Sequence, residues 1–134
     1  MANALYPKWK EQLLQFTTNN NLSAGTVKVA LVDTGTYTYS SSHQFYSSVS
    51  SAVVGTPQTL GSKTYTNGTF DAADSTFSAV SGASVEALVI YIDTGSAATS
   101  PLVAYIDTGV TGLPVTPNGG DIAVAWNASG IFAL

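Results

Sequence analysis

The tripeptide Asp-Thr-Gly is the pattern in this sequence whose residue types best suit catalysis. It occurs three times, at residues 33–35, 93–95 and 107–109, and each copy directly follows an apolar run. Two carboxylates that are held close together can share one proton and activate a water molecule. Acid–base chemistry is therefore the first hypothesis to weigh for this chain.

These tripeptides resemble the active-site loop of aspartic proteases, whose retroviral-type members are small all-β homodimers. That family also has a glycine-rich flap and a later apolar segment, ending in glycine, that supports the catalytic loop. Here Gly35 is followed by Thr-Tyr-Thr-Tyr, and no such supporting segment is recognisable. A retropepsin-like aspartic protease therefore stays only as a remote alternative.

A simpler interpretation is that each Asp-Thr-Gly forms a turn at the end of a strand. The aspartate accepts hydrogen bonds from the following backbone amides, and a glycine with positive φ closes the turn. A protease needs one copy per lobe, whereas a β protein can reuse the same turn. We therefore predict that Asp33, Asp93 and Asp107 are turn residues and that the chain has no catalytic residue.

Other catalytic and metal-binding chemistries find little support in the sequence. The absence of cysteine excludes disulfides, thiolate zinc sites and cysteine nucleophiles, and the single histidine, His43, excludes a histidine metal cage within one chain. Asp71 and Asp74 lack the spacing of a calcium loop, and Glu86 with Asp121 is one of many possible carboxylate pairs. We predict no metal site and no cofactor.

The composition bounds the class of protein further. The chain has 134 residues, of which 9% are charged, with a net charge of −4 and no arginine. Because nucleic-acid binders use arginine and a basic surface, that class is excluded. The longest apolar stretch, residues 87–92, is too short to span a membrane, and the N-terminus shows no apolar targeting segment. We expect one domain, made in the cytoplasm.

One helix is predicted near the N-terminus. Pro7 suits a first helical position, and Trp9, Leu13 and Phe16 follow at helical spacing, with Leu14 widening the apolar stripe. A helix this short needs a docking partner, either its own sheet or a neighbouring subunit. Residues 1–20 are therefore expected to form a helical arm. A second, weaker helical turn is predicted at residues 42–49.

The remaining pattern predicts strands, so the fold expected is mainly β: an antiparallel β-sandwich or barrel with one short N-terminal α-helix. Its single domain, residues 1–134, consists of the arm and a β body from residue 26 onward. Residues 85–92 are the most apolar and are predicted to form the central strand, with residues 102–106 antiparallel to it. Asn67-Gly68 predicts a hairpin. The other expected strands are 26–32, 36–39, 63–66, 69–77, 122–126 and 131–134.

Four stretches spread along the chain carry a resemblance: residues 1–8, 28–34, 85–91 and 111–122, together with Trp126 and the Ile131-Phe132 ending. In these stretches the chain resembles small structural proteins of tailed-bacteriophage virions. The resemblance implies a non-enzymatic capsid decoration or cement protein on the virion surface. It would bind between subunits of the head shell, with the major capsid protein and further copies of itself, usually as a trimer, as partners. The hypothesised interface residues are Leu5, Trp9, Leu13 and Phe16.

A tail component is the alternative within the same group. A tail-tube, baseplate or fibre-associated module could use residues 85–107 as a hairpin that adds to a ring. It could also use the aromatic segment at residues 36–45 as an exposed loop that binds a receptor or glycan. The loop residues predicted for that role are Tyr37, Tyr39, His43 and Phe45.

Overall fold

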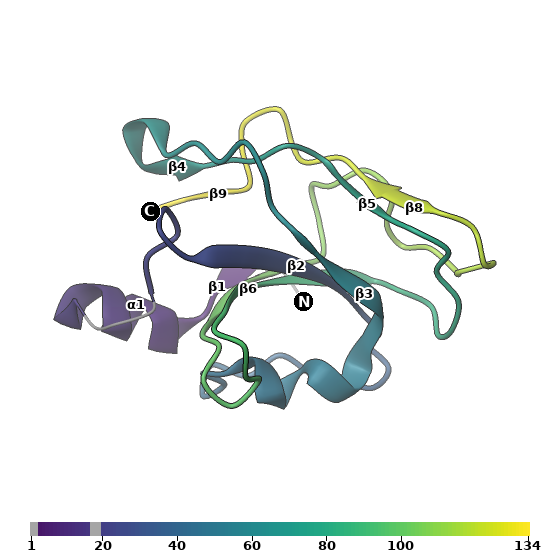
Figure 1. The fold of residues 1–134 in the computed structure, drawn as a ribbon, viewed down its shortest axis with the longest axis horizontal. Helices are drawn as coiled ribbons and strands as arrows, with labels where there is room; N and C mark the ends of the chain where they lie inside the picture. Colours follow the sequence, from purple (N-terminus) through teal and green to yellow (C-terminus); the bar gives the residue numbers. More distant parts are fainter. Residues whose placement is uncertain (1–2, 17–19) are drawn as a thin grey trace.

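The computed structural model describes residues 3–16 and 20–134, and strands dominate it (Figure 1). One α-helix, α1 (Pro7–Gln15), lies near the N-terminus, and three 3-10 turns are present: η1 (Tyr46–Ser48), η2 (Ser50–Ala52) and η3 (Thr66–Gly68). The strands are β1 (Ala4–Leu5), β2 (Thr26–Val32), β3 (Val53–Thr59), β4 (Thr69–Phe70), β5 (Ser75–Phe77), β6 (Ala87–Asp93), β7 (Leu102–Ile106), β8 (Ile122–Val124) and β9 (Phe132–Ala133).

The main sheet has five antiparallel strands in the order β1-β7-β6-β2-β3. Its middle strand is β6, which pairs with β2 along its whole length, from Thr26 opposite Asp93 to Val32 opposite Ala87. On its other side β6 pairs antiparallel with β7. The predicted central strand and its antiparallel partner are therefore confirmed.

Both faces of this sheet are covered, which explains why its central strands are continuously apolar. All residues of β7, and all of β6 except Asp93, are buried. Figure 1 shows the small sheets β4-β9 and β5-β8 on one side of the main sheet and turns η1 and η2 on the other. The prediction of a mainly β, antiparallel fold with one N-terminal helix is confirmed. The sheets do not close into a complete sandwich or barrel.

One predicted strand is wrong, and one predicted hairpin is shorter than expected. Residues 36–39 form a loop, since the backbone N–H groups of Thr36 and Tyr37 donate to the carbonyl of Asp33 and close a turn. The hairpin at Asn67-Gly68 is reduced to the single bridge between Thr64 and Asp71. The strand that follows, β4, pairs with β9 at the C-terminal end instead.

The sequence-based prediction missed strands β3 and β1 and misplaced one helical turn. Strand β3 contains Gly55 and Pro57, residues that argue against a strand, but it forms an edge, where proline is tolerated. Strand β1 has only two residues. The helical turn predicted at residues 42–49 lies slightly later, as the two short turns η1 and η2.

The arm and the β body share one hydrophobic core. Tyr6 and Trp9 belong to the same buried cluster as the residues of β2, β6 and β7. Tyr6 also donates its backbone N–H to the carbonyl of Val103, which extends the pairing of β1 with β7. The first part of α1 is therefore fixed to the main sheet.

Candidate functional site

The three Asp-Thr-Gly turns do not come together in the chain. Asp93 ends β6, whereas Asp33 and Asp107 follow β2 and β7, which run in the opposite direction. Asp93 therefore lies at the opposite end of the sheet. Asp33 and Asp107 share one end but are separated by β6, so two strand spacings, about 9–10 Å, divide their backbones. No two of these aspartates form the close pair that a shared proton requires.

Each turn is stabilised by hydrogen bonds to its backbone amides. The Oδ1 atoms of Asp33 and Asp93 accept the N–H groups of Gly35 and Gly95 at 2.8 and 2.9 Å. In the third turn, the side chain of Asn3 supplies the acceptor, and its Oδ1 receives the N–H of Asp107 at 2.7 Å. Positive φ occurs at Gly95 and Gly109 but not at Gly35, so the expectation for glycine was wrong in the first turn.

The other candidate acids also serve the backbone. Asp74 accepts the N–H of Trp126 at 3.0 Å, and Asp121 accepts that of Ala79 at 3.0 Å. Asp71 accepts the N–H of its neighbour Ala72. Glu86 and Asp121, considered as a catalytic pair, bind different segments of the chain. Among residues 3–16 and 20–134, no group of three or more His, Asp and Glu side chains could hold a metal ion.

Two carboxylates have pKa values shifted downward. Burial acts to raise the pKa of Glu86, but hydrogen bonds from Ser84 and Thr34 outweigh it and hold this pKa below its ordinary range. The pKa of Asp93 is lowered by its hydrogen bond with Lys28, at 2.9 Å, and by the N–H of Gly95. Both groups are therefore anionic near neutral pH, which suits turn stabilisation rather than proton donation.

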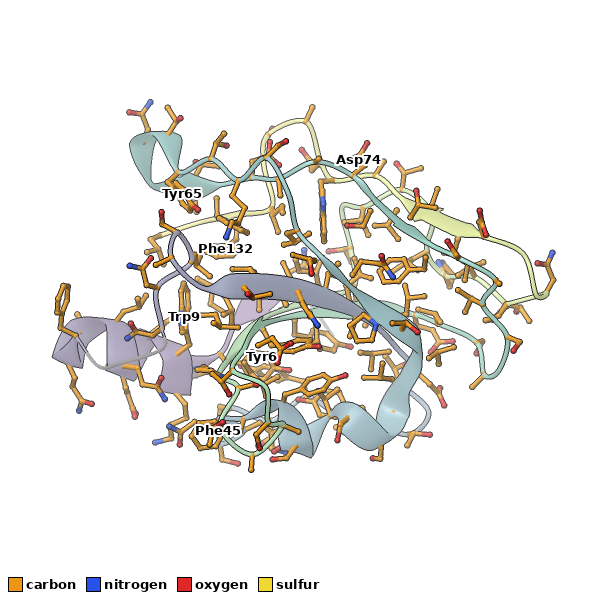
Figure 2. All side chains as sticks on the ribbon, viewed as in Figure 1. Tyr6, Trp9, Phe45, Tyr65, Asp74 and Phe132 are labelled. Atoms are coloured by element: carbon orange, nitrogen blue, oxygen red, sulfur yellow. The ribbon has the colours of Figure 1, made fainter. Side chains whose placement is uncertain are left out.

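The first half of the arm is committed to the core. Trp9 is 2% exposed, its Nε1–H donates to the carbonyl of Asn20 at 3.3 Å, and its ring meets Phe132 edge-on with centroids 5.8 Å apart. Figure 2 shows these two side chains between α1 and β9. Leu5 and Leu13 are half-buried against the same core. Three of the four hypothesised interface residues thus pack on the chain's own β body.

The end of the arm is exposed, contrary to the apolar stripe predicted for it. Phe16 is 95% exposed and Leu14 is 89% exposed. The helix ends at Gln15, and Phe16 adopts the left-handed conformation, with φ of 58° and ψ of 42°. Its N–H bonds to the carbonyls of Gln12 and Leu13. Because the chain leaves the helix here, Phe16 no longer shares the face of Trp9.

The aromatic segment at residues 36–45 is packed rather than presented. Tyr37 is 4% exposed, and Tyr39, His43 and Phe45 are half-buried. The ring of Tyr39 lies 5.1 Å from that of Tyr6 and 5.6 Å from that of Tyr105. The expectation of an exposed aromatic loop was wrong for Tyr37, because this segment covers β7 and the start of α1.

A chain of hydrogen bonds fixes this segment to the arm. The hydroxyl of Tyr37 lies 2.8 Å from the hydroxyl of Tyr6 and 2.8 Å from Nδ1 of His43. When Nδ1 of His43 is the acceptor, Tyr37 donates to His43 and Tyr6 donates to Tyr37, so both hydroxyl protons are used. Burial raises the pKa of both tyrosines above the ordinary value of 10.0.

The hairpin considered for a tail-tube subunit is part of the main sheet. Strands β7 and β6 lie second and third from the β1 edge, and all their residues except Asp93 are buried. They do not project from the body as a free arm. No helix in the described part of the chain has the length and apolar character needed to cross a membrane.

Comparisons with known proteins leave the family open. Comparison of the chain with protein-family models returned no match, and comparison with curated protein sequences returned none either. The functional interpretation therefore rests on the residues themselves, on the resemblance described above and on the exposed end of α1. Sequence reasoning missed a further group, the neutral polar residues Thr108, Asn127 and Ser129, which line one pocket. No sequence signal linked these residues, because they lie on two separate turns.

Proposed function

We propose that this chain is a non-enzymatic structural protein of a bacteriophage virion that decorates the capsid. It binds between subunits of the head shell, and its partners are the major capsid protein and further copies of itself, as a trimer. The resemblance in four stretches spread along the chain supports this proposal. So does the commitment of Asp33, Asp93 and other candidate acids to backbone amides.

The single observation that carries the proposal is the conformation and exposure of Phe16. A left-handed backbone costs a residue other than glycine about 1–2 kcal/mol. Phe16 adopts it while 95% of its side chain is exposed, so the isolated chain gains almost no packing in return. Strain of this kind is characteristic of functional positions. A partner surface that covers Phe16 and Leu14 accounts for both features.

The arm is well suited to present these two side chains. Trp9 anchors the helix to the body, so Leu14 and Phe16 are held in fixed positions rather than on a loose tail. Fixed positions reduce the conformational entropy lost on binding. With only 9% charged residues, the chain has few ion pairs for salt to screen, so we expect particle binding to depend little on ionic strength.

The copy number of the chain in purified particles is the first test. A ratio near one copy per major capsid protein is the result expected of a decoration protein that follows the shell lattice. A ratio of a few per cent would overturn decoration in favour of the tail alternative. Complete absence from particles would contradict any virion role, and peptide cleavage by the chain would then be assayed with Asp33→Asn as control.

The second test is the binding of purified protein to particles that lack it. Phe16→Ser and Leu14→Ser should each weaken binding at least several-fold, because each removes apolar surface from the contact. Leu134→Ser is the matched control, since Leu134 is also an exposed apolar residue, at 75%, but lies at the C-terminus. Equal binding by all three variants would show that the end of α1 is not the contact.

A further inference from the structure

A pocket of about 320 Å³ lies between the turn after β7 and the segment that joins β8 to β9. Thr108 and Val110 belong to its first wall, and Trp126, Asn127 and Ser129 to its second. Its volume is at the small end of known ligand sites, which span about 300–1,000 Å³. The pocket is separate from the exposed end of α1, so a ligand bound in it is independent of the proposed function.

The second wall is held in place by contacts within the chain. The backbone N–H of Trp126 donates to Asp74, and its Nε1–H donates to the carbonyl of Ala73 at 3.2 Å. Asp74, labelled in Figure 2, lies on the segment between β4 and β5. Gly130 has a φ of 108°, and a Cβ there would lie 2.5 Å from Cγ2 of Thr69. The wall is therefore shaped before any ligand arrives, which lowers the entropy lost on binding.

The lining of the pocket combines apolar and neutral polar groups. Ile106 and Trp126, which are 3% and 8% exposed, supply apolar surface. Thr108, Asn127 and Ser129 are exposed and supply hydroxyl and amide groups. None of the lining residues carries a charge. An ionic ligand would therefore find no counter-charge in this pocket.

Several hydrogen-bonding groups at the pocket are unused. Oδ1 of Asn127 accepts the backbone N–H of Ser129 at 2.9 Å, which orients the amide and leaves its Nδ2 group without a partner among the described residues. The hydroxyls of Thr108 and Ser129 likewise bond to no group in that part of the chain. A ligand can thus receive at least one amide donor and two hydroxyls.

We propose that this pocket binds one unit of a neutral saccharide. A sugar ring has an apolar C–H face, which fits against Ile106 and Trp126, and hydroxyls that can pair with Thr108, Asn127 and Ser129. An anion would lack a cationic partner here, a cation would lack a carboxylate, and a lipid tail would leave the polar groups unpaired. A saccharide therefore matches both the apolar and the neutral polar groups that line the pocket.

The test is a nuclear magnetic resonance titration of the isotopically labelled chain with glucose, galactose, mannose and N-acetylglucosamine, each alone. At least one sugar should shift the amide signals of Thr108, Asn127 and Ser129 and the indole signal of Trp126 in a saturable way. For a shallow site of this size we expect a dissociation constant on the order of 1–10 mM.

Two matched variants make the titration specific. Asn127→Asp keeps the oxygen that accepts the N–H of Ser129 but removes the Nδ2 donor, so sugar binding should weaken about tenfold. Asn118→Asp is the control, because Oδ1 of Asn118 accepts the N–H of Gly120 in the same way, outside the pocket. This variant should bind like the wild type.

Three outcomes would overturn the proposal. The first is that no sugar shifts the pocket signals at concentrations well above 10 mM, the weak end of the expected range. The second is that Asn127→Asp and Asn118→Asp bind alike. The third is that the pocket signals move with protein concentration in the absence of sugar, because a second copy of the chain would then be the occupant.

Discussion

The N-terminal arm has two halves that use similar apolar residues in opposite ways: an anchored half, with Tyr6 and Trp9, and a free half, with Leu14 and Phe16. Tyr6 and Trp9 are 0% and 2% exposed and belong to the core, whereas Leu14 and Phe16 are 89% and 95% exposed. The anchored half of the arm contributes to folding, and the free half is available for association. An apolar side chain on a helix therefore has no fixed role until distant segments cover it or leave it bare.

The difference arises from what lies beside each half. The main sheet, Asn20 and Phe132 surround the start of the helix and provide hydrogen-bond and ring partners. The helix then extends past the edge of the sheet, as Figure 1 shows, and Leu13 is the last residue of the arm that packs on the core, whereas Leu14 and Phe16 do not. Variants in the two halves should accordingly separate stability from association.

The largest effect is expected for Trp9→Ala. Removing a fully buried tryptophan leaves a cavity and should lower the free energy of unfolding by about 3–5 kcal/mol, measured by urea denaturation. Leu14→Ala is the matched control in the free half and should change this free energy by no more than about 0.5 kcal/mol. Similar losses for both variants would contradict the division of the arm.

The chain of hydrogen bonds that links Tyr6 to Tyr37 and His43 should give the next largest effect. Tyr37→Phe leaves the hydroxyl of Tyr6, which is 0% exposed, without its hydrogen-bond partner and should cost about 1–3 kcal/mol of unfolding free energy. Tyr6→Phe lets Tyr37 keep its bond to His43 and should cost only about 0.5–1.5 kcal/mol. The reverse order would contradict the role of Tyr37 as the hydrogen-bond partner that satisfies the hydroxyl of Tyr6.

The raised pKa values of the same two tyrosines predict a loss of stability at alkaline pH. Burial raises the pKa of Tyr6 in the folded chain above the ordinary value of 10.0 that applies in the unfolded chain. The resulting stabilisation is complete below pH 10 and is lost as the pH rises beyond it, at up to about 1.4 kcal/mol per pH unit for each group. Denaturation curves across this range should therefore have a shallower alkaline decline in Tyr6→Phe. Parallel declines would refute the assignment.

The sequence predicts those parts of the fold whose causes are local or strongly apolar. Strand β2 has the predicted bounds, and β6 and β7 were found because covering both faces of a sheet requires continuous apolar residues. Strand β3 was not predictable from its own residues, since Gly55 and Pro57 disfavour strands and it exists only because β2 offers an edge. Residues 36–39 are of types that favour strands, yet the hydrogen bonds of the nearby turn at Asp33 keep them in a loop.

In the candidate sites, too, the features with local causes were predictable and those that depend on distant residues were not. The turns at Asp33 and Asp93 were predictable because the acceptor lies two residues from the donor. The third turn depends on Asn3, which is 104 residues from Asp107, and no local pattern reports such a contact. The exposure of Phe16 was missed for a related reason. Helical spacing assumes that the helix continues, and here it ends one residue too early.

The smallest expected effect tests the free half most sharply. Phe16→Gly should raise the free energy of unfolding of the isolated chain by about 0.5–1 kcal/mol, because glycine adopts a φ of 58° without steric cost and Phe16 contributes little packing. The same variant should lose binding to shells that lack the protein. Phe16→Asn, whose side chain also tolerates this conformation, should behave in the same way in both assays. A lower stability in Phe16→Gly would mean that the aromatic ring supports the fold, and the contrast between the two halves of the arm would then fail.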